Sequence, residues 1–425
     1  MIEKMIDFIE NSPTAFGAIY NIEKILKENG YKKLNNSKIN KGEKYYLTRN
    51  DSSIIAINVG KELYDASMQI CASHSDCPGF KLKPEAVIKD KYGTRLNIET
   101  YGGLLKRPWF DRPLILAGRV MVAENDKLTK RIFIDDKPIC IIPSMAPHLS
   151  RDIEEKPINV SKELFPIVSV NDDFDLNEYL AEKLSVKKED IYGFDLYLAP
   201  YHSSLRWGRN DEFFTCGHID NLECAYTTLM GFINGSNDKN INIYACFDNE
   251  EVGSRTRQGA DSDFLYNAVN RLCKDLELDY NSLLEQSMML SCDNAHAIHP
   301  NYTDLYDSLN APVINNGVVI KYNASQSYTT DSLSGGLFKK LLDDNKIKWQ
   351  NFANKTGTRG GGTLGNISTS HLSIMSADIG LGQWAMHSPV ETAGVKDAEY
   401  MIKACEAFYN AHLNKDEDDA YQFVK

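Results

Sequence analysis

The sequence lacks any long apolar run, since nowhere do about 18 apolar residues follow one another as a membrane-spanning helix requires. The first residues, MIEKMIDFIENSPTAF, carry Glu3, Lys4, Asp7 and Glu10 and therefore do not resemble the apolar part of a secretion signal. The nine cysteines are odd in number and none are spaced as CxxC. We expect a soluble, cytoplasmic protein with reduced thiols and no membrane partner.

Basic charge is also scarce, because 47 Lys and Arg face 59 Asp and Glu, for a net charge of -12. Nucleic-acid binding needs a basic surface, so this balance argues against it. The sequence has no GxxxxGK[ST] phosphate loop, and although Ser388 follows His387 it has no GxSxG element, which argues against nucleotide hydrolysis and serine hydrolysis. Small solutes or peptides are the expected partners.

The chain is long enough, at 425 residues with 42% apolar side chains, to form two or three domains. Residues 1–34 are expected to be helical, with Ser12 and Pro13 marking a helix start. The strand-like runs INIYACF, MMLSCD, VIKYN and IMSADIGL alternate with helical segments such as NLECAYTTLMGFI and DFLYNAVNRLCKDLE. This alternation predicts a layered α/β fold.

The middle of the chain has a different hydrophobic pattern from its two ends. Between residues 86 and 207, short alternating runs such as RLNIET and LILAGRVMVA are broken by turn signals, which predicts a strand-rich region. We therefore predict one discontinuous α/β domain, residues 1–85 and 208–425, interrupted by a β-rich insert at residues 86–207.

Acidic and histidine side chains follow several of the strand-like runs. The set consists of His74 and Asp76 in ASHSD, Asp220 in GHIDNL, Glu250 and Glu251 in FDNEEVGS, Asp293 in SCDNAHAIHP, and His387 in AMHSP. Singly, each is explained as a turn, capping or packing residue. Together they are the nitrogen and oxygen ligands expected for paired divalent metals, whose charge makes a cluster of buried acids favourable. Asp76 suits the acceptor of the second N–H of a metal-bound His74.

These motifs, in this order, resemble the M18 family of metallo-aminopeptidases, the aspartyl aminopeptidase family. The resemblance rests on HSD, GHIDNL, DNEEVGS, SCDNAHAIHPNY and AMHSPVE, together with PWFDRPLILAGRV, APHLSRD and GGGTLG, and it covers nearly the full chain. It implies a mixed-sheet dinuclear-metallopeptidase domain with an inserted dimerisation domain. The related M42 and M20 peptidases share the ligand pattern but lack AHAIHPNY and PWFDRPLILAGRV.

The resemblance also implies roles for individual residues. Two divalent ions, zinc before cobalt or manganese, would be held by His74, Asp220, Glu251, Asp293 and His387, with Asp220 as the bridge. Glu250 would be the catalytic base, and Asp76 the catalytic-site residue behind His74. The adjacent glutamates then divide the work, because a proton carrier must not be committed to metal.

Substrate contacts are implied for His148, His296, Lys321 and Tyr328, for which ordinary polar surface is the alternative interpretation. A cation at Lys321 fits an acidic N-terminal residue of a short peptide substrate. The family usually has Arg two residues before the bridging Asp, where this chain has His218, so a titratable group is added and the pH dependence is left open. Dimers assembled into a tetrahedral dodecamer are further implied, with His148 reaching a neighbour's site.

Two other classes of function compete with this interpretation. Residues 360–365, GGGTLG, satisfy the dinucleotide pattern GxGxxG, but WQNFANKTGTR before them is a poor strand and Asp378 lies only 13 residues beyond Gly365. We interpret the motif as a glycine-rich wall close to substrate or metals. A non-catalytic assembly protein of the same fold is the other alternative, and the complete ligand set argues against it.

Overall fold

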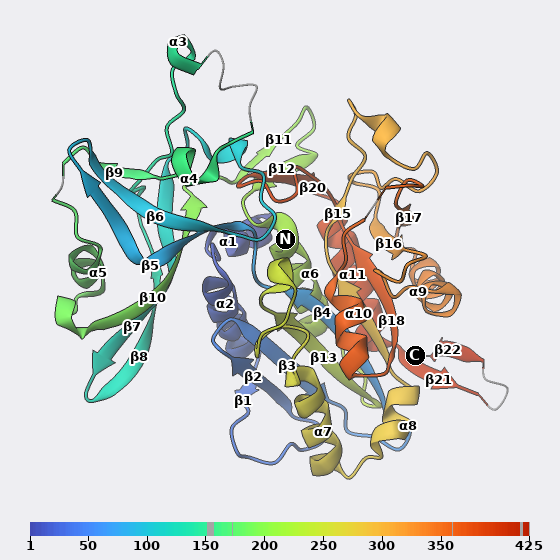
Figure 1. The fold of residues 1–425 in the computed structure, drawn as a ribbon. Helices are drawn as coiled ribbons and strands as arrows, with labels where there is room; N and C mark the ends of the chain where they lie inside the picture. The colour runs from blue at the N-terminus through green and yellow to red at the C-terminus, as the bar shows by residue number, and fades with distance from the viewer. Residues whose placement is uncertain (151–156, 172, 359, 417–419, 425) are drawn as a thin grey trace.

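The computed structural model describes residues 1–150, 157–171, 173–358, 360–416 and 420–424. Its largest sheet has nine strands in the order β1-β2-β3-β13-β4-β14-β18-β16-β17 (Figure 1). Their bounds are β1 Lys32–Lys33, β2 Lys44–Arg49, β3 Ser53–Val59, β13 Asn240–Phe247, β4 Ser67–His74, β14 Met288–Cys292, β18 Met375–Gly380, β16 Val318–Tyr322 and β17 Trp349–Ala353.

Four neighbouring strands of this sheet, β13, β4, β14 and β18, run parallel to one another. Every residue of β13, β4 and β14 is buried, which explains their almost continuous apolar sequences. Because these strands are parallel, their carboxyl ends meet at one edge of the sheet, where ligand sites of α/β proteins form. The α/β layering predicted from the sequence is confirmed.

Helices cover both faces of the nine-stranded sheet. One face contacts α1 Ile2–Glu10, α2 Ala15–Glu28, α6 Ile219–Asn234, α9 Ser332–Asp344 and α11 Asp397–Asn410, and the other contacts α7 Phe264–Leu276, α8 Tyr280–Glu285 and α10 Leu364–His371. Each face has its own apolar core, with Leu229 and Phe408 in the first and Leu272 and Met289 in the second. The sheet therefore has no large solvent-exposed face, and the functional groups collect at its ends.

The N-terminal region is helical as predicted, but the expected helix start is wrong. The residue that caps α2 is Thr14, whose side chain accepts a hydrogen bond from the Gly17 N–H at 3.3 Å. Ser12 is buried and lies in the short connection between the two helices. Ser and Thr at neighbouring positions carry the same capping chemistry, so composition alone does not distinguish them.

A second sheet of six antiparallel strands lies beside the first, in the order β8-β7-β10-β5-β6-β9 (Figure 1). The bounds are β8 Lys127–Ile134, β7 Leu114–Glu124, β10 Ile191–Pro200, β5 Gly79–Asp90, β6 Gly93–Tyr101 and β9 Ile167–Ser169. It has a separate core that includes Phe80, Trp109 and Leu196, and α5 (Leu176–Leu184) covers part of it. Residue 86 lies within β5, and the division into two domains stays a prediction.

Smaller elements complete the fold. A five-stranded sheet contains β11 Leu205–Trp207, β12 Phe213–Cys216, β20 Glu391–Gly394, β19 Gly382–Trp384 and β15 Ala295–His296, and a hairpin joins β21 His412–Lys415 to β22 Tyr421–Val424. The short helices are α3 Pro147–Ser150, α4 Val160–Glu163, η1 Arg107–Trp109, η2 Lys188–Asp190, η3 Glu250–Val252 and η4 Thr303–Leu305. Within the described residues, no helix combines the length and apolar character needed to cross a membrane.

Candidate metal centre

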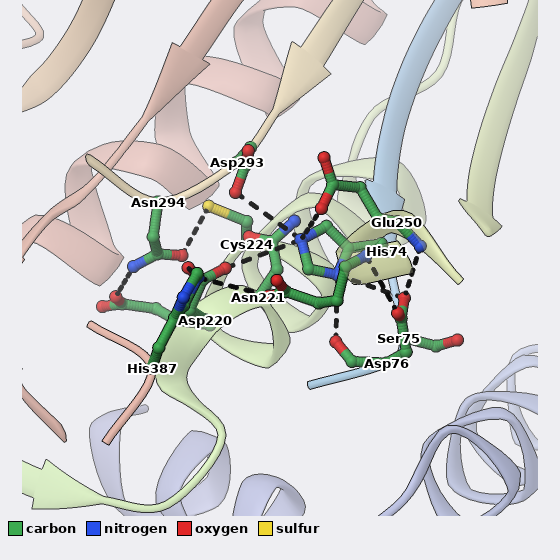
Figure 2. A network of polar contacts seen from close by, with 12 residues as sticks. His74, Ser75, Asp76, Asp220, Asn221, Cys224, Glu250, Asp293, Asn294 and His387 are labelled. Carbon is green, nitrogen blue, oxygen red and sulfur yellow. Dashed lines mark hydrogen bonds and ion pairs between the residues drawn. The ribbon is translucent and has the colours of Figure 1, made fainter. Parts of the chain in front are cut away.

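The strand ends bring the predicted site residues together. His74 is the last residue of β4, and Asp293 directly follows β14. Glu250 and Glu251 lie in η3, in the turn that follows β13. Asp220 is in the first turn of α6, and His387 follows β19 (Figure 2). Segments about 300 residues apart in the sequence therefore meet at one place.

Asp220 lies between the two imidazoles. Its Oδ1 is 3.5 Å from His74 Nε2, and its Oδ2 is 3.5 Å from His387 Nε2. On the first side, Asp293 Oδ1 is 3.6 Å from His74 Nε2, and on the second, Glu251 Oε1 is 3.5 Å from His387 Nε2. Two groups of candidate ligands thus share one carboxylate, each with its ligand atoms within 4.8 Å of one another.

The donor set fits divalent cations. Asp220 is 4% exposed, and its Oδ1 is buried without a hydrogen-bond partner among the described residues. Such an oxygen costs free energy unless a cation or a donor meets it. Imidazole nitrogens and carboxylate oxygens at this density are zinc-type ligands.

Both imidazoles are oriented through their other nitrogen. His74 Nδ1 lies 3.0 Å from the main-chain carbonyl oxygen of Asp76, and His387 Nδ1 lies 2.9 Å from that of Gly103. A carbonyl can only accept, so each Nδ1 carries the proton and donates it. This tautomer leaves each Nε2 lone pair directed at the carboxylates, as metal ligation requires.

Asp76 lies behind His74 and also contacts the turn that carries the two glutamates. Its carboxylate Oδ1 is 3.4 Å from His74 Nδ1, farther than its own carbonyl oxygen. The carboxylate also accepts the N–H groups of Glu250 at 3.1 Å and Glu251 at 3.2 Å, and the hydroxyl of Tyr101 at 2.7 Å. It therefore fixes the turn that carries the two glutamates.

Burial and neighbouring carboxylates raise the pKa of both adjacent glutamates. Burial, followed by the charges of Asp293, Asp76 and Asp220, raises the pKa of Glu250 to about 8 although His74 opposes the shift. Glu250 Oε2 is 4.0 Å from His74 Nε2, and Glu250 also forms a candidate ligand group with His74 and Glu251. A bound cation reverses this repulsion and favours the ionised carboxylates.

His218 does not add charge to the site at neutral pH. Burial lowers its pKa to about 4, so the imidazole is neutral over the range in which His74 and His387 can ligate metal. Its backbone has φ 62°, and it belongs to none of the candidate ligand groups among the described residues.

Three of the four expected substrate contacts form one group, and Lys321 within it lies beside Asp293. Lys321 Nζ is 3.7 Å from Asp293 Oδ2, donates to the Asn294 carbonyl at 2.8 Å and lies 5.5 Å from the Tyr328 ring centroid. The His296 ring meets Phe352 edge-on at 5.0 Å, and the Tyr328 ring lies 6.1 Å from the same Phe352. Lys321 is 2% exposed, so its charge is compensated mainly within the protein.

His148 is separate from this group. It lies on α3, at the end of a long excursion from the second sheet and apart from β4 (Figure 1). Its side chain is exposed. The structure of one chain therefore does not bring His148 to its own metal centre.

Glu391 is a site residue that the sequence interpretation did not select. It is 1% exposed and accepts the N–H of Asp220 at 2.9 Å and that of His387 at 2.7 Å. Burial and the charge of Asp220 raise its pKa to about 8. Its sequence signal was its place in AMHSPVE, four residues after His387.

Two residues of the GGGTLG motif, Thr363 and Gly365, contact the sheet. Thr363 directly precedes α10, and its hydroxyl donates to Asp378 on β18 and does not cap the helix. A Cβ on Gly365 would lie 2.9 Å from the Asp378 carboxylate oxygens and from Ser291 Cβ. This glycine thus permits close contact between α10 and the sheet. WQNFA, expected to be a poor strand, is β17.

Comparisons with known proteins agree over nearly the whole chain. The family model described as Aminopeptidase I zinc metalloprotease (M18) matches residues 8–409. A probable M18 family aminopeptidase 2 from Clostridium novyi (strain NT) is 41% identical over 425 residues, covering 96% of this chain and 98% of the relative. In the cryo-EM structure of the Ape4 and Nbr1 complex, one chain is 30% identical with TM-score 0.92, covering 96% of this chain and 85% of that one. A chain of the S. cerevisiae mApe1 dodecamer shares the fold at TM-score 0.86 and 24% identity, with 96% of each chain covered.

Proposed function

The chain belongs to the M18 family of zinc metallo-aminopeptidases and hydrolyses peptide bonds, and from this premise we propose how its own residues do so. His74, Asp220 and Asp293 hold one divalent ion, and Asp220, Glu251 and His387 hold a second. The observation that carries this assignment is the position of Asp220, whose two oxygens are directed at two different imidazoles. Zinc is the expected ion.

Glu250 is the proton carrier of the reaction. When bound, two such ions acidify water and polarise the scissile carbonyl. Glu250 takes a proton from the attacking water and returns it to the nitrogen of the leaving amine as the C–N bond breaks. Burial raises the pKa of Glu250, and its carboxylate would be ionised before the reaction if the site residues held divalent cations beside it.

The proposed substrate is a short peptide with a free N-terminus. The free α-amino group is a cation that carboxylates of the site can hold, and it distinguishes an aminopeptidase from an endopeptidase or an amidohydrolase of the M20 type. N-acetylated peptides are therefore refused. A panel of aminoacyl amides, with zinc, cobalt and manganese supplied in turn, identifies the preferred N-terminal residue and metal.

Self-association is part of the proposed function. The exposed α3 carries His148 away from its own site, and the related mApe1 of S. cerevisiae forms a dodecamer. We infer that the insert at residues 86–207 joins two chains and that His148 contributes to the partner's site. There its imidazole stabilises the oxyanion that forms on the substrate carbonyl.

Two glutamine variants test the division of labour between the adjacent glutamates. Glu250→Gln keeps the side-chain shape but cannot accept the proton, so kcat falls by about 10²–10⁴-fold while two metals per chain remain bound. Glu251→Gln loses metal instead, as measured by elemental analysis after dialysis. Loss of metal from Glu250→Gln, or full metal content and activity in Glu251→Gln, would show that the roles are assigned wrongly.

A further inference from the structure

One short segment of the second sheet contacts both halves of the metal centre. β6 ends at Tyr101, whose hydroxyl donates to Asp76 Oδ2 at 2.7 Å and accepts from Asn249 Nδ2 at 2.8 Å. Two residues later, the Gly103 carbonyl oxygen lies 2.9 Å from His387 Nδ1. The Leu105 N–H donates to the His387 carbonyl oxygen at 3.0 Å.

The Tyr101 hydroxyl joins two supports of the turn that carries Glu250 and Glu251. Asp76 is the first support, since its carboxylate accepts both glutamate N–H groups. Asn249 is the second: it begins the turn with φ 62°, and its Oδ1 accepts from Thr256 at 2.8 Å and Gln258 at 2.9 Å. Because the Tyr101 hydroxyl fixes both Asp76 and Asn249, it restricts the direction in which the side chains of Glu250 and Glu251 leave the turn.

This segment also approaches Glu251 closely. Gly102 has φ +69°, and a Cβ there would lie 3.1 Å from Glu251 Cβ and 3.3 Å from Pro78 Cβ. A larger residue at this position would be strained in the left-handed region and would press on Glu251. Residues 101–105 are therefore in contact with the glutamate turn as well as with His387.

We propose that residues 101–105 form a positioning strap through which the second sheet holds the metal centre in its working geometry. Tyr101 positions Glu250 and Glu251 through Asp76 and Asn249, and Gly103 with Leu105 positions His387. This inference rests on the proposed function for the roles of those residues. It gives the insert a task at the catalytic centre of its own chain, so that displacement of the second sheet changes metal retention and turnover.

Tyr101→Phe removes the hydroxyl and keeps the ring. Tyr197→Phe is the matched control, because the Tyr197 ring meets the Tyr101 ring edge-on at 5.7 Å while its hydroxyl makes no hydrogen bond to a residue that the structure describes. Tyr101→Phe is expected to lower kcat about tenfold or more with KM unchanged, since a hydrogen bond to a charged group is lost. It is also expected to release metal to a chelator faster, while Tyr197→Phe behaves as wild type.

Hydrogen exchange reports on the turn independently of activity. Peptides covering residues 248–254 are expected to exchange about tenfold faster or more in Tyr101→Phe, with and without metal, because the Glu250 and Glu251 amides lose their fixed acceptor. Peptides from β13 serve as the internal reference and remain unchanged. Wild-type exchange in the turn, or faster exchange in β13 to the same degree, would overturn the proposed strap.

A glycine pair provides a second test that does not depend on Tyr101. Gly102→Ala is expected to lower metal retention and kcat, whereas Gly193→Ala, which has nothing within 4 Å of the added Cβ, leaves both unchanged. If Glu250→Gln keeps its activity, the assignment of Glu250 as the base is wrong. The hydrogen-exchange rates of the Glu250 and Glu251 amides still test the strap in that case. Equal behaviour of Gly102→Ala and Gly193→Ala contradicts it.

Discussion

Asp220 illustrates at the scale of one residue why buried acids persist at this edge of the sheet. A carboxylate that is 4% exposed loses most of its hydration, and one of its oxygens has no donor among the described residues. Each Asp220 oxygen is directed at a different Nε2, which is the geometry of a carboxylate that two cations can share. Such cations would offset the free-energy cost of burying the charge. The same reasoning applies to Glu391, which orients Asp220 and His387 through their main-chain N–H groups.

Glu391→Gln is expected to weaken metal binding about 10–100-fold, the usual effect of losing a partner that orients ligands. The amide has one acceptor oxygen, so one of the two N–H groups of Asp220 and His387 loses its bond. Competition with a chelator measures the affinity. Glu399→Gln, on an exposed glutamate of α11 paired with Lys403, is the matched control. Unchanged affinity in Glu391→Gln would remove Glu391 from the site.

His218 provides a prediction of pH dependence. Its folded-state pKa of about 4 is below the usual 6.5, so the stability it contributes is present above about pH 6.5 and is lost as pH falls toward 4. His218→Asn cannot take up a proton, and Asn tolerates positive φ. The free energy of unfolding of the metal-free protein, measured with urea, should therefore change less with pH in this window in the variant than in wild type. The difference in slope is up to about 1.4 kcal/mol per pH unit. A parallel pH dependence in wild type and variant would contradict the burial of this imidazole.

At the scale of elements, the contact between α6 and α11 depends on the absence of a side chain. A Cβ on Gly231 of α6 would lie 2.4 Å from Cys405 Cβ and 3.0 Å from the Ile402 carbonyl oxygen. Because α6 carries Asp220 at its start, this close contact also fixes the helix that presents the shared carboxylate. The core on this face of the sheet contains both helices.

Gly231→Ala is expected to destabilise the protein by about 1–3 kcal/mol, because the added methyl group overpacks a buried contact. Gly336→Ala on α9, where nothing lies within 4 Å of the added Cβ, is the control and should stabilise by up to about 1 kcal/mol. Thermal unfolding of the two variants gives shifts of opposite sign. Similar shifts for both would mean that α6 relaxes away from α11 at little cost.

Many of the helices and strands could be predicted from the sequence. INIYACF and MMLSCD predict strands because buried parallel strands are apolar on both faces. INIYACF forms most of β13, and MMLSCD contains all of β14 together with Asp293. The capping residue before α2 was not, because Thr14 and Ser12 offer the same hydroxyl chemistry. β17 was missed because its residues are half polar, and pairing with β16, not intrinsic preference, makes WQNFA a strand.

At the scale of the whole molecule, the candidate site also has a part that could be predicted from the sequence and a part that could not. The side chains that meet at the candidate metal centre were predictable because two histidines and several acids that follow apolar runs can be recognised in the sequence as possible ligands. The groups that hold them were not. The Gly103 carbonyl and the main-chain carbonyl of Asp76 orient the imidazoles, and any residue has a carbonyl. Tyr101 lies in the second sheet, so only the fold brings it to Asp76.

The position of α3 leads to the prediction for the assembled protein. His148 is exposed and far from the metal centre of its own chain, although the resemblance gives it a role at a substrate carbonyl (Figure 1). Both statements hold together if a symmetric dimer exchanges the two α3 segments, since a twofold interface places equivalent residues in each partner's site. His148→Ala and Glu250→Gln are then each inactive for different reasons, in different parts of one composite site.

Mixing these two inactive proteins tests the composite site. After subunit exchange, a dimer with one chain of each kind contains one site with the intact Glu250 of the first chain and the intact His148 of the second. Since half of the chains in random exchange form such dimers and each has one of two sites intact, recovered activity should approach one quarter of the wild-type rate. Mass spectrometry of differently labelled chains verifies the exchange. Mixed dimers without recovered activity, or full activity in His148→Ala alone, would mean that each chain completes its own site, and α3 would then serve assembly without taking part in catalysis.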